Sequence, residues 1–550
     1  MQKQQSRLAL LIAAVALSAA MSAGCGGGGG DGASPSPAPA TPPAAPPPSP
    51  APVGFGPSLS GLAVVSRLEV PAVTPQPSSA VPVPVFNNRY TPVGRRVAWG
   101  DFNGDGLNDI VICPGFFTSL PLLPCEIWLN RGGGRFSPGT AEVVDGQLGL
   151  QSNVNSLHVA DFNRDGRADI VVVTQGREAY DSGPNAFKSR NLVFMSQPSG
   201  KLKDVSATAL ASDTEGFHHP SAVGDVDGDG WLDLAVTELG GLNGSGMATG
   251  VYFLLNDRLG GFLRSTAGLP PEVRSTDFTV PGAPDIDHLA PGTAQLADLD
   301  GDGRLDLVTT AYINGSIKTN TRETRVYRQQ PDGSFELRAR IPLPTELATL
   351  RAPDGTGIGA FCIAAGDLDG DGRPDVVIGF ENLFIDASYV QVLRNDGSFG
   401  FSDRTAAWLG GYRQSVAQGA PANQTTLIAN LRIADLNGDG KADLVLGVPN
   451  IFHNTLGAWS PFWLNDGSGR MAPWLPLIGG VRRTSTVQNA AEWTEVFQIT
   501  STRNTDLLAF DATGDGLIDW VFLDAIDANV TVNGMNTESG MYVRVLPRIP

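Results

Sequence analysis

The stretch DFNGDGLNDIV, residues 101–111, decides the fold, because the chain of 550 residues contains it in seven related copies. The others are DFNRDGRADIV from residue 161, DVDGDGWLDLA from 225, DLDGDGRLDLV from 298, DLDGDGRPDVV from 367, DLNGDGKADLV from 435 and DATGDGLIDWV from 511. We call them loops 1 to 7 and number the positions of each from its first aspartate. Such internal repetition predicts an array of similar structural units.

Each loop concentrates oxygen ligands on a short turn. Positions 1, 3, 5 and 9 carry oxygen-bearing side chains, position 6 is glycine, and position 7 can offer its main-chain carbonyl. Calcium prefers such oxygens at this spacing, and the glycine permits the sharp turn. Clustered carboxylates also repel one another unless a cation neutralises them. The sequence therefore predicts up to seven calcium ions, with loop 7 the weakest site because Thr513 replaces the usual Asp or Asn.

The predicted calcium ligands occupy positions 1, 3, 5, 7 and 9 of every loop. They are Asp101, Asn103, Asp105, Leu107, Asp109, Asp161, Asn163, Asp165, Arg167, Asp169, Asp225, Asp227, Asp229, Trp231, Asp233, Asp298, Asp300, Asp302, Arg304, Asp306, Asp367, Asp369, Asp371, Arg373, Asp375, Asp435, Asn437, Asp439, Lys441, Asp443, Asp511, Thr513, Asp515, Leu517 and Asp519.

Two other interpretations of the loops compete with this one. An EF-hand needs Glu at position 12 and a helix after the loop, whereas position 12 is Ile112 in loop 1 and Val236 in loop 3. The runs that follow, such as IVICPG and IVVVTQ, predict strands instead. Asp, Asn and Gly also form tight turns without metal, so purely structural turns are the remaining alternative.

The residues between loops predict four antiparallel strands in each unit. One apolar strand enters each loop and a second leaves it; a third follows as EIWLN, LVFMS, VYFLLN, RVYRQ, VQVLR or PFWLN. Turns such as NRGGGRF then suit a hairpin to a fourth strand. Units of this kind are typical of propeller blades.

The repeated pattern D-x-[DN]-x-D-G-x-x-D followed by a β run resembles the FG-GAP or VCBS-repeat family, whose best-known relatives are the integrin α subunits. The resemblance covers about residues 60–550. It implies an all-β, seven-bladed β-propeller with four-stranded antiparallel blades and a calcium-binding loop between strands 1 and 2 of each blade.

Ring closure and a binding face follow from this arrangement. The last repeat lacks a fourth strand, so residues 62–70 are expected to pair with residues 541–547 and remove an open edge. The long connections at 175–190, 271–292, 409–430, 449–460, 478–504 and 524–540 are expected on the face opposite the calcium loops. Long loops gathered on one rim favour ligand binding there.

The N-terminal segment predicts export. Residues 1–25 join basic residues to a short apolar run and end in MSAGC, which resembles a lipoprotein signal with lipidation at Cys25. Ser22 stands where Leu is usual, so cleavage by an ordinary signal peptidase is the alternative. Residues 26–57 form a Gly- and Pro-rich tether, and residues 58–550 form the propeller. The expected location is the outer membrane or cell surface through the lipid anchor alone, or else the periplasm or the medium.

Composition limits the possible partners. The net charge is −18, and seven divalent ions would add fourteen positive charges and bring it to −4. The sequence has no basic stripe, which argues against nucleic acid. Cys113 and Cys125 flank a turn between two apolar strands and are expected to pair in an oxidising compartment, and Cys362 reads as an ordinary buried thiol.

The sequence favours binding over catalysis. It contains no H-E-x-x-H, G-x-S-x-G, Walker A lysine or paired C-x-x-C motif, so no catalytic residue is assigned. Glu178, Asp181 and Asp285 are acid–base candidates, but solvated loop charges are commoner, and the histidines are expected to pack or line the channel. We expect a monomeric, adhesion-like module for a protein or glycan ligand. A polysaccharide lyase or glycoside hydrolase and a structural surface protein are the alternatives.

Overall fold

The computed structural model describes strands, turns and a few helical turns in the region after residue 65. The described residues are 66–68, 95–114, 123–151, 154–175, 189–239, 248–277, 289–312, 323–344, 359–382, 387–409, 431–436, 439–446, 462–473, 502–516, 518–526, 531–532, 535–536 and 540–546. The chain divides into two units, Met1–Ser49 and Pro50–Pro550, and all of these residues belong to the second. The predicted signal segment, Cys25 and most of the predicted tether belong to the first, and all of residues 1–57 lie outside the described residues.

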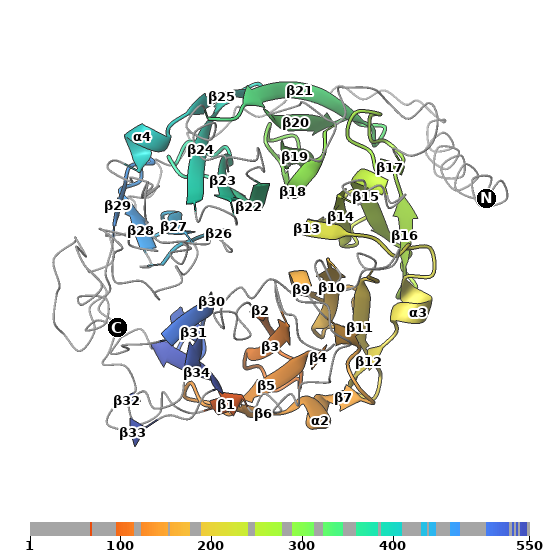
Figure 1. The fold of residues 1–550 in the computed structure, drawn as a ribbon, viewed down its shortest axis with the longest axis vertical. Helices are drawn as coiled ribbons and strands as arrows, with labels where there is room; N and C mark the ends of the chain where they lie inside the picture. The colour runs from red at the N-terminus through yellow and green to blue at the C-terminus, as the bar shows by residue number, and fades with distance from the viewer. Residues whose placement is uncertain are drawn as a thin grey trace, which may run out of the picture. The chain divides into compact units, whose positions relative to one another are not determined.

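The described strands of Pro50–Pro550 form antiparallel sheets, one around each repeat (Figure 1). The sheets are given from inner to outer strand. The first contains β2 (Arg95–Gly100), β3 (Asp109–Pro114), β5 (Glu126–Asn130) and β6 (Phe136–Pro138), and the second contains β9 (Val154–Ala160), β10 (Asp169–Thr174), β11 (Leu192–Ser196) and β12 (Leu202–Asp204), with β7 (Val144–Asp145) paired in parallel to β12. The third contains β13 (His218–Gly224), β14 (Asp233–Leu239), β15 (Ala248–Asn256) and β16 (Phe262–Ser265), with β17 (Thr276–Asp277) paired to β15, and the fourth contains β18 (Pro291–Ala297), β19 (Asp306–Ala311), β20 (Glu323–Gln329) and β21 (Phe335–Pro342).

The later repeats continue the pattern. Their sheets are β22 (Gly359–Gly366), β23 (Asp375–Asn382), β24 (Ala387–Gly397) and β25 (Gly400–Asp403); β26 (Leu431–Ala434), β27 (Asp443–Leu446), β28 (Phe462–Asn465) and β29 (Met471–Pro473); and β30 (Thr502–Phe510), β31 (Asp519–Ile526), β34 (Gly540–Leu546) and β1 (Ser66–Leu68). Two small pairs join β4 (Leu123–Pro124) to β8 (Leu150–Gln151) and β32 (Thr531–Val532) to β33 (Met535–Asn536). The prediction of an all-β propeller with four-stranded antiparallel blades is therefore confirmed.

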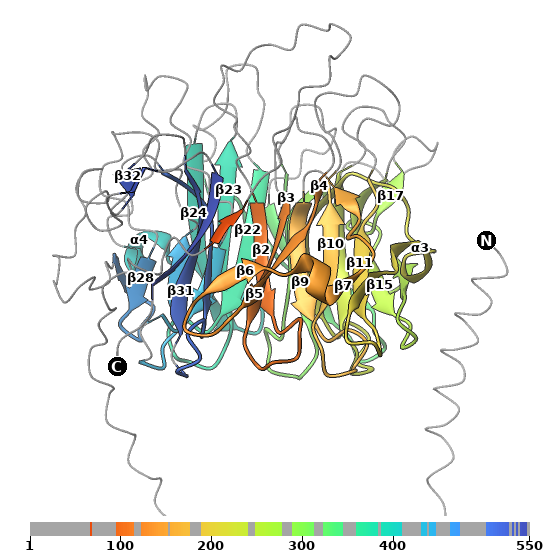
Figure 2. The ribbon, with the colours of Figure 1, turned by 90° about the horizontal axis from the view of Figure 1, so that it is seen from below.

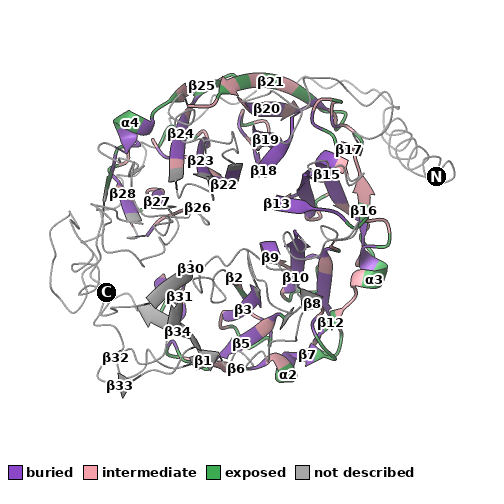
Figure 3. Ribbon diagram, in the orientation of Figure 1, coloured by how far each residue is buried: buried purple, intermediate pink, exposed green. Residues whose placement is uncertain are grey.

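Burial explains why the second strand of each sheet is the most apolar. Every residue of β10, β14 and β19 is buried, because neighbouring sheets cover both faces of these strands. In the outer strand β21, Phe335 is buried and the residues after it alternate between exposed and half-buried, as in a strand with one solvated face. Figure 3 shows the same gradient, with buried segments inside and exposed ones at the periphery.

Adjacent sheets pack through separate apolar cores. The inner strands contact one another in the order β30, β2, β9, β13, β18, β22 and β26. Val97 and Trp128 of the first sheet share a core with Leu508 and Phe510 of the last sheet. The first and last repeats therefore meet directly, as a closed ring requires.

An N-terminal strand completes the last sheet. β1 pairs antiparallel with β34, with Ser66 opposite Val543 and Leu68 opposite Met541. The predicted pairing of residues 62–70 with 541–547 is thus confirmed over these residues. The outer edge of β34 is consequently covered.

In the part of the chain that the structure describes, three one-turn helices follow outer strands, namely α2 (Thr140–Val143), α3 (Ser206–Ala209) and α4 (Thr405–Trp408). The hydroxyl of the first helical residue accepts a hydrogen bond from the third strand of the same sheet. In the first sheet the donor is the Ile127 N–H, and in the fifth it is the Val392 N–H. Among the described residues, no helix is both long and apolar enough to cross a membrane.

The disulfide expected from the sequence is present. Cys113 near the end of β3 and Cys125 just before β5 form it across 12 residues of sequence. Cys362 of β22 is half-buried against the core between the fifth and sixth sheets.

Candidate metal centres

Each loop connects the first and second strands of its sheet, and the described loops lie at one edge of the sheets (Figure 2). Position 9 is the first residue of the second strand, as with Asp109 in β3 and Asp375 in β23. The glycine at position 6 has a positive φ, 84° at Gly106 and 83° at Gly372. Such angles favour glycine, which explains why this position does not vary among the loops.

Main-chain N–H groups fix the carboxylate at position 1. In loop 1, Asp101 Oδ1 accepts hydrogen bonds from Gly104 N at 2.7 Å and Asp105 N at 3.2 Å, and Oδ2 accepts one from Gly106 N at 2.8 Å. Asp367 of loop 5 repeats this pattern at 2.8, 3.1 and 2.9 Å. The main-chain hydrogen bonds alone therefore orient the carboxylate at position 1.

The carboxylate at position 9 is buried within the sheet. Asp109 is fully buried; its Oδ2 accepts from Phe102 N at 2.9 Å and its Oδ1 from Asn130 N at 2.8 Å. The same two bonds occur at Asp375, from Leu368 N at 2.9 Å and Asn395 N at 2.8 Å. Position 9 thus ties the loop to the third strand of its own sheet.

Burial also sets the protonation of position 9. Desolvation raises the pKa of Asp109, Asp169, Asp306, Asp375 and Asp443 to about 6 and that of Asp233 to about 7, although the main-chain hydrogen bonds oppose the shift. A nearby cation would favour the ionised form.

Positions 1, 3 and 5 converge. In loops 3, 4 and 5, one carboxylate oxygen from each of these residues lies within 4.8 Å of the others, in the groups Asp225, Asp227 and Asp229; Asp298, Asp300 and Asp302; and Asp367, Asp369 and Asp371. Calcium binds oxygens at about 2.3–2.6 Å, so ligands on opposite sides of one ion lie up to about 5 Å apart. These donors fit a single hard cation in each loop. The buried position 9 carboxylates are not members of these groups.

Loop 7 keeps the framework despite its threonine. Asp511 accepts from Gly514 N, Asp515 N and Gly516 N at 2.6, 3.1 and 2.7 Å. Among the described residues of this loop, the Oγ1 atom of Thr513 is buried and has no hydrogen-bond partner. A buried hydroxyl in that state is costly unless a further ligand satisfies it, so Thr513 also fits a cation site. Its weakness relative to the other loops stays a prediction.

Several predicted ligands are placed differently or not at all. Asn437 and Leu517 lie outside the described residues. The sequence suggested only a main-chain carbonyl ligand at position 7. In loops 4 and 5 the side chain at this position also makes a contact, since Arg304 and Arg373 each donate a hydrogen bond to the position 5 carboxylate of their loop. Trp231 stacks under the guanidinium of Arg164 at 4.7 Å.

Sequence reasoning missed an amide at the end of the third strand. Asn395 Nδ2 donates to the Leu299 carbonyl in loop 4 at 2.8 Å, and Asn130 Nδ2 donates to the Ala512 carbonyl in loop 7 at the same distance. The equivalent donors Asn256, Gln329 and Asn465 each reach position 2 of the preceding loop. The repeated N or Q that ends EIWLN, VYFLLN, RVYRQ and PFWLN was the available signal.

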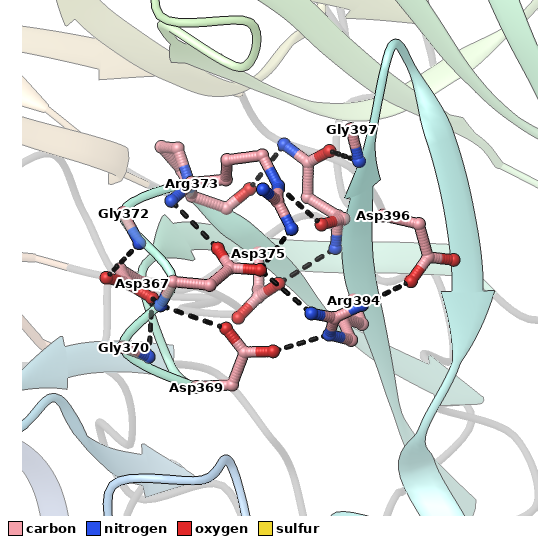
Figure 4. A network of polar contacts seen from close by, with 12 residues as sticks. Asp367, Asp369, Gly370, Gly372, Arg373, Asp375, Arg394, Asp396 and Gly397 are labelled. Carbon is pink, nitrogen blue, oxygen red and sulfur yellow. Dashed lines mark hydrogen bonds and ion pairs between the residues drawn. The ribbon is translucent and has the colours of Figure 1, made fainter.

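Sequence reasoning also missed arginines that touch the acidic groups. Arg394 donates to Asp369, Asp371 and Asp396, as Figure 4 shows for loop 5. Arg328 donates to Asp300 and Asp302 in loop 4. Desolvation would raise the pKa of Asp302, but the Arg304 N–H and the two neighbouring guanidinium groups outweigh it and lower that pKa.

The histidines behave as predicted where they are described. His218 and His219 of β13 are buried, and His158 of β9 bonds to Ser221 Oγ at 2.8 Å. Burial lowers the pKa of His219 to about 3, so its ring is neutral. Glu178, Asp181 and Asp285 lie outside the described residues, as do most of the long connections.

Comparison with known families supports the repeat assignment. Residues 101–172 and 298–378 match the FG-GAP-like repeat, and residues 430–451 match the FG-GAP repeat. A search of curated proteins gives no match.

Several solved structures are similar to this chain at low identity. An Agrocybe aegerita lectin that recognises non-reducing terminal N-acetylglucosamine is 18% identical, with 70% of this chain and 81% of that chain covered and a TM-score of 0.37. A Bacillus licheniformis rhamnogalacturonan lyase is 13% identical over 83% and 71%, with a TM-score of 0.35. The periplasmic gluconolactonase of Pseudomonas aeruginosa is 13% identical over 70% and 85%, with a TM-score of 0.37. Likeness at this level carries no argument about the fold or the activity of this chain.

Proposed function

We propose that this chain, whose matched repeats belong to the FG-GAP family, is an exported, calcium-stabilised, seven-bladed β-propeller that binds a protein or glycan. The observation that carries the proposal is the convergence of three carboxylates within 4.8 Å in each of loops 3, 4 and 5. Carboxylates at that separation repel one another, and a divalent cation would offset the repulsion that the arginines of loops 4 and 5 leave.

The blade number in the proposal follows the repeats. One blade for each loop makes seven, and β1 supplies the outer strand of the last blade. Calcium then acts as a folding ligand at the loop edge, because oxygen sites that form only in the folded loop bind the native state alone.

The binding role is assigned to the edge opposite the loops. At the loop edge, main-chain hydrogen bonds and the proposed calcium ions occupy the polar groups. The connections at 175–190, 409–430 and 449–460 are longer than a strand-to-strand turn requires. Extra length, glycine and aromatic residues on one rim suit recognition of a partner.

Export and anchoring rest on residues 1–57. Cys25 is the proposed lipidation site, and the Gly- and Pro-rich tether would hold the propeller away from the membrane. A Cys25→Ser variant should leave the membrane fraction and appear in soluble fractions. Unchanged membrane association would contradict the lipid anchor but not the propeller.

A binding screen tests the function. The mature chain, with calcium or with EDTA, would be applied to glycan and protein arrays and incubated with polysaccharides while product release is followed. The proposal predicts calcium-dependent binding without turnover. Turnover would favour a polysaccharide lyase or glycoside hydrolase, and neither binding nor turnover would favour a structural surface protein.

Shortening two connections locates the binding face. Deletions within 176–188 and 449–460 should abolish binding and leave thermal melting unchanged. Loss of folding with unaltered binding per folded molecule would contradict the assignment.

A further inference from the structure

Two blades carry an arginine where the others carry an apolar residue. The residue just before the third-strand amide is Arg328 in blade 4 and Arg394 in blade 5. The matched residues of the other described third strands are Leu129, Met195, Leu255 and Leu464. A charged residue at this position is therefore a property of loops 4 and 5.

Both arginines bind their loops through the same atoms. Arg328 Nε lies 2.6 Å from Asp300 Oδ2, and Arg328 Nη2 lies 2.7 Å from Asp302 Oδ2. Arg394 Nε bonds to Asp369 Oδ2, and Arg394 Nη2 lies 2.9 Å from Asp371 Oδ2 (Figure 4). Each guanidinium therefore bridges positions 3 and 5, which are two of the three converging ligands.

A second arginine reinforces position 5. Arg304 and Arg373, at position 7, donate to the Oδ2 atoms of Asp302 and Asp371. Each of these loops has four aspartates, so two arginines halve its charge. The bridging side chains are only 29% and 26% exposed, which limits screening by solvent.

In other loops, different groups contact the side chains at positions 3 and 5. In loop 1 the amide of Asn103 donates to Asp105 Oδ2 at 2.9 Å, and no charge is added. In loop 3, Arg258 contacts Asp229 alone at 2.6 Å, and its side chain is 57% exposed. Bridging of positions 3 and 5 by a partly buried arginine distinguishes loops 4 and 5 among the described loops.

We infer that Arg328 and Arg394 are resident cations, which hold loops 4 and 5 in the calcium-free protein and compete with calcium for the carboxylates at positions 3 and 5. The inference rests on the proposed calcium function and divides its sites into two classes. Loops 4 and 5 bind calcium more weakly and depend on it less, whereas loop 1, which has three aspartates and no basic residue, needs it to offset its charge.

Coulomb repulsion supplies the reason. An ion bound to the same Oδ2 atoms would lie about 4–5 Å from the guanidinium carbon, where like charges repel strongly even at intermediate dielectric. Either the arginine side chain must therefore move away from the carboxylates when calcium binds, or the affinity of the loop for calcium is lower. Removing it should tighten calcium binding about tenfold at each of the two sites, after allowance for partial solvent screening.

The full chain with Arg328→Met and Arg394→Met tests the competition. Its matched control is Arg131→Met with Arg338→Met, which removes two arginines paired with Glu142 and Glu336 rather than with a loop. Calcium titration calorimetry should show two sites tightened about tenfold relative to the control, and the variant should melt at a lower temperature than the control in EDTA. Equal affinities and equal melting would overturn the inference.

Hydrogen exchange of the wild-type chain gives a second test that needs no variant. Chelator should raise exchange of loop 1 about tenfold more than that of loops 4 and 5, because the arginines of loops 4 and 5 remain. Equal increases would overturn the inference alone. Absence of calcium binding in wild type and variants would overturn the proposed calcium function and this inference together.

Discussion

Loop 1 and loop 5 share one backbone framework but neutralise their acidic side chains in different ways. In both, three N–H groups hold the position 1 carboxylate and two more hold the buried position 9 carboxylate. Loop 1 then uses the neutral Asn103, whereas loop 5 uses Asp369 with Arg394.

The difference separates two functions of the repeat. The framework depends on groups that every loop contains, namely the aspartates at positions 1 and 9 and the glycine at position 6. Charge compensation depends on the third strand, which varies from blade to blade. Substitution of a framework residue should therefore lower stability equally in loops 1 and 5, whereas the two loops should differ in how much they depend on calcium.

Removal of the position 9 carboxylate should have the largest effect and should be equal in the two loops. Asp109→Ala or Asp375→Ala leaves two buried N–H groups without acceptors, at a cost of about 4 kcal/mol of unfolding free energy. Urea unfolding in calcium measures it. A large loss in one loop and none in the other would contradict a common framework.

Removal of the disulfide should affect blade 1 and not blade 5, since blade 1 alone among the described blades contains it. Cys113→Ser with Cys125→Ser opens a link across 12 residues and should cost about 3 kcal/mol. Hydrogen exchange should rise in β3 and β5 and stay constant in β23 and β24. Cys362→Ser is the control, and a uniform rise in exchange across both blades would contradict a local effect.

Acidity should affect both loops alike. Burial raises the pKa of Asp109 and Asp375 to about 6 in the folded chain, from 3.8. In EDTA, their stabilising contribution is therefore fully present below pH 3.8 and is lost as the pH rises to about 6. The loss should be about 3 kcal/mol for each carboxylate.

Neutral variants test this pH dependence. Asp109→Asn with Asp375→Asn should reduce the change in unfolding free energy between pH 4 and pH 7 in EDTA. An identical slope in wild type and variant would show that these two carboxylates do not titrate in that window.

The cross-blade amides should give the smallest effect. Asn130→Ala and Asn395→Ala each remove a hydrogen bond to the preceding loop and leave a buried carbonyl less satisfied, at a cost of about 1–2 kcal/mol. Thermal melting in calcium measures the loss. Equal stability of wild type and both variants would mean that the packed side chains alone join the blades.

Much of the fold was predictable from local pattern. Seven acidic turns, β-branched runs after them and Gly-rich hairpins predicted antiparallel blades, and the missing last strand predicted the pairing of β1 with β34. These features depend on periodicity and turn chemistry, which short stretches of sequence determine.

The site was only partly predictable, because spacing does not determine which atoms face one another. Asp109 and Asp375 looked like simple ligands, yet their oxygens bind main-chain N–H groups of a strand about twenty residues later. Arg328 and Arg394 looked like ordinary strand residues, and only the antiparallel register with the second strand brings them to their loops. The ligand-binding connections carry no motif whose chemistry would identify a partner.

Thermal melting of the mature chain in calcium, in magnesium and in EDTA tests the central claim most directly. Each calcium site at tenfold saturation contributes about 1.4 kcal/mol, so several sites should raise the melting temperature by about 5–10 °C over EDTA. Magnesium should stabilise less, because it demands a stricter octahedral geometry. Equal melting temperatures in calcium and EDTA would contradict a calcium-stabilised propeller.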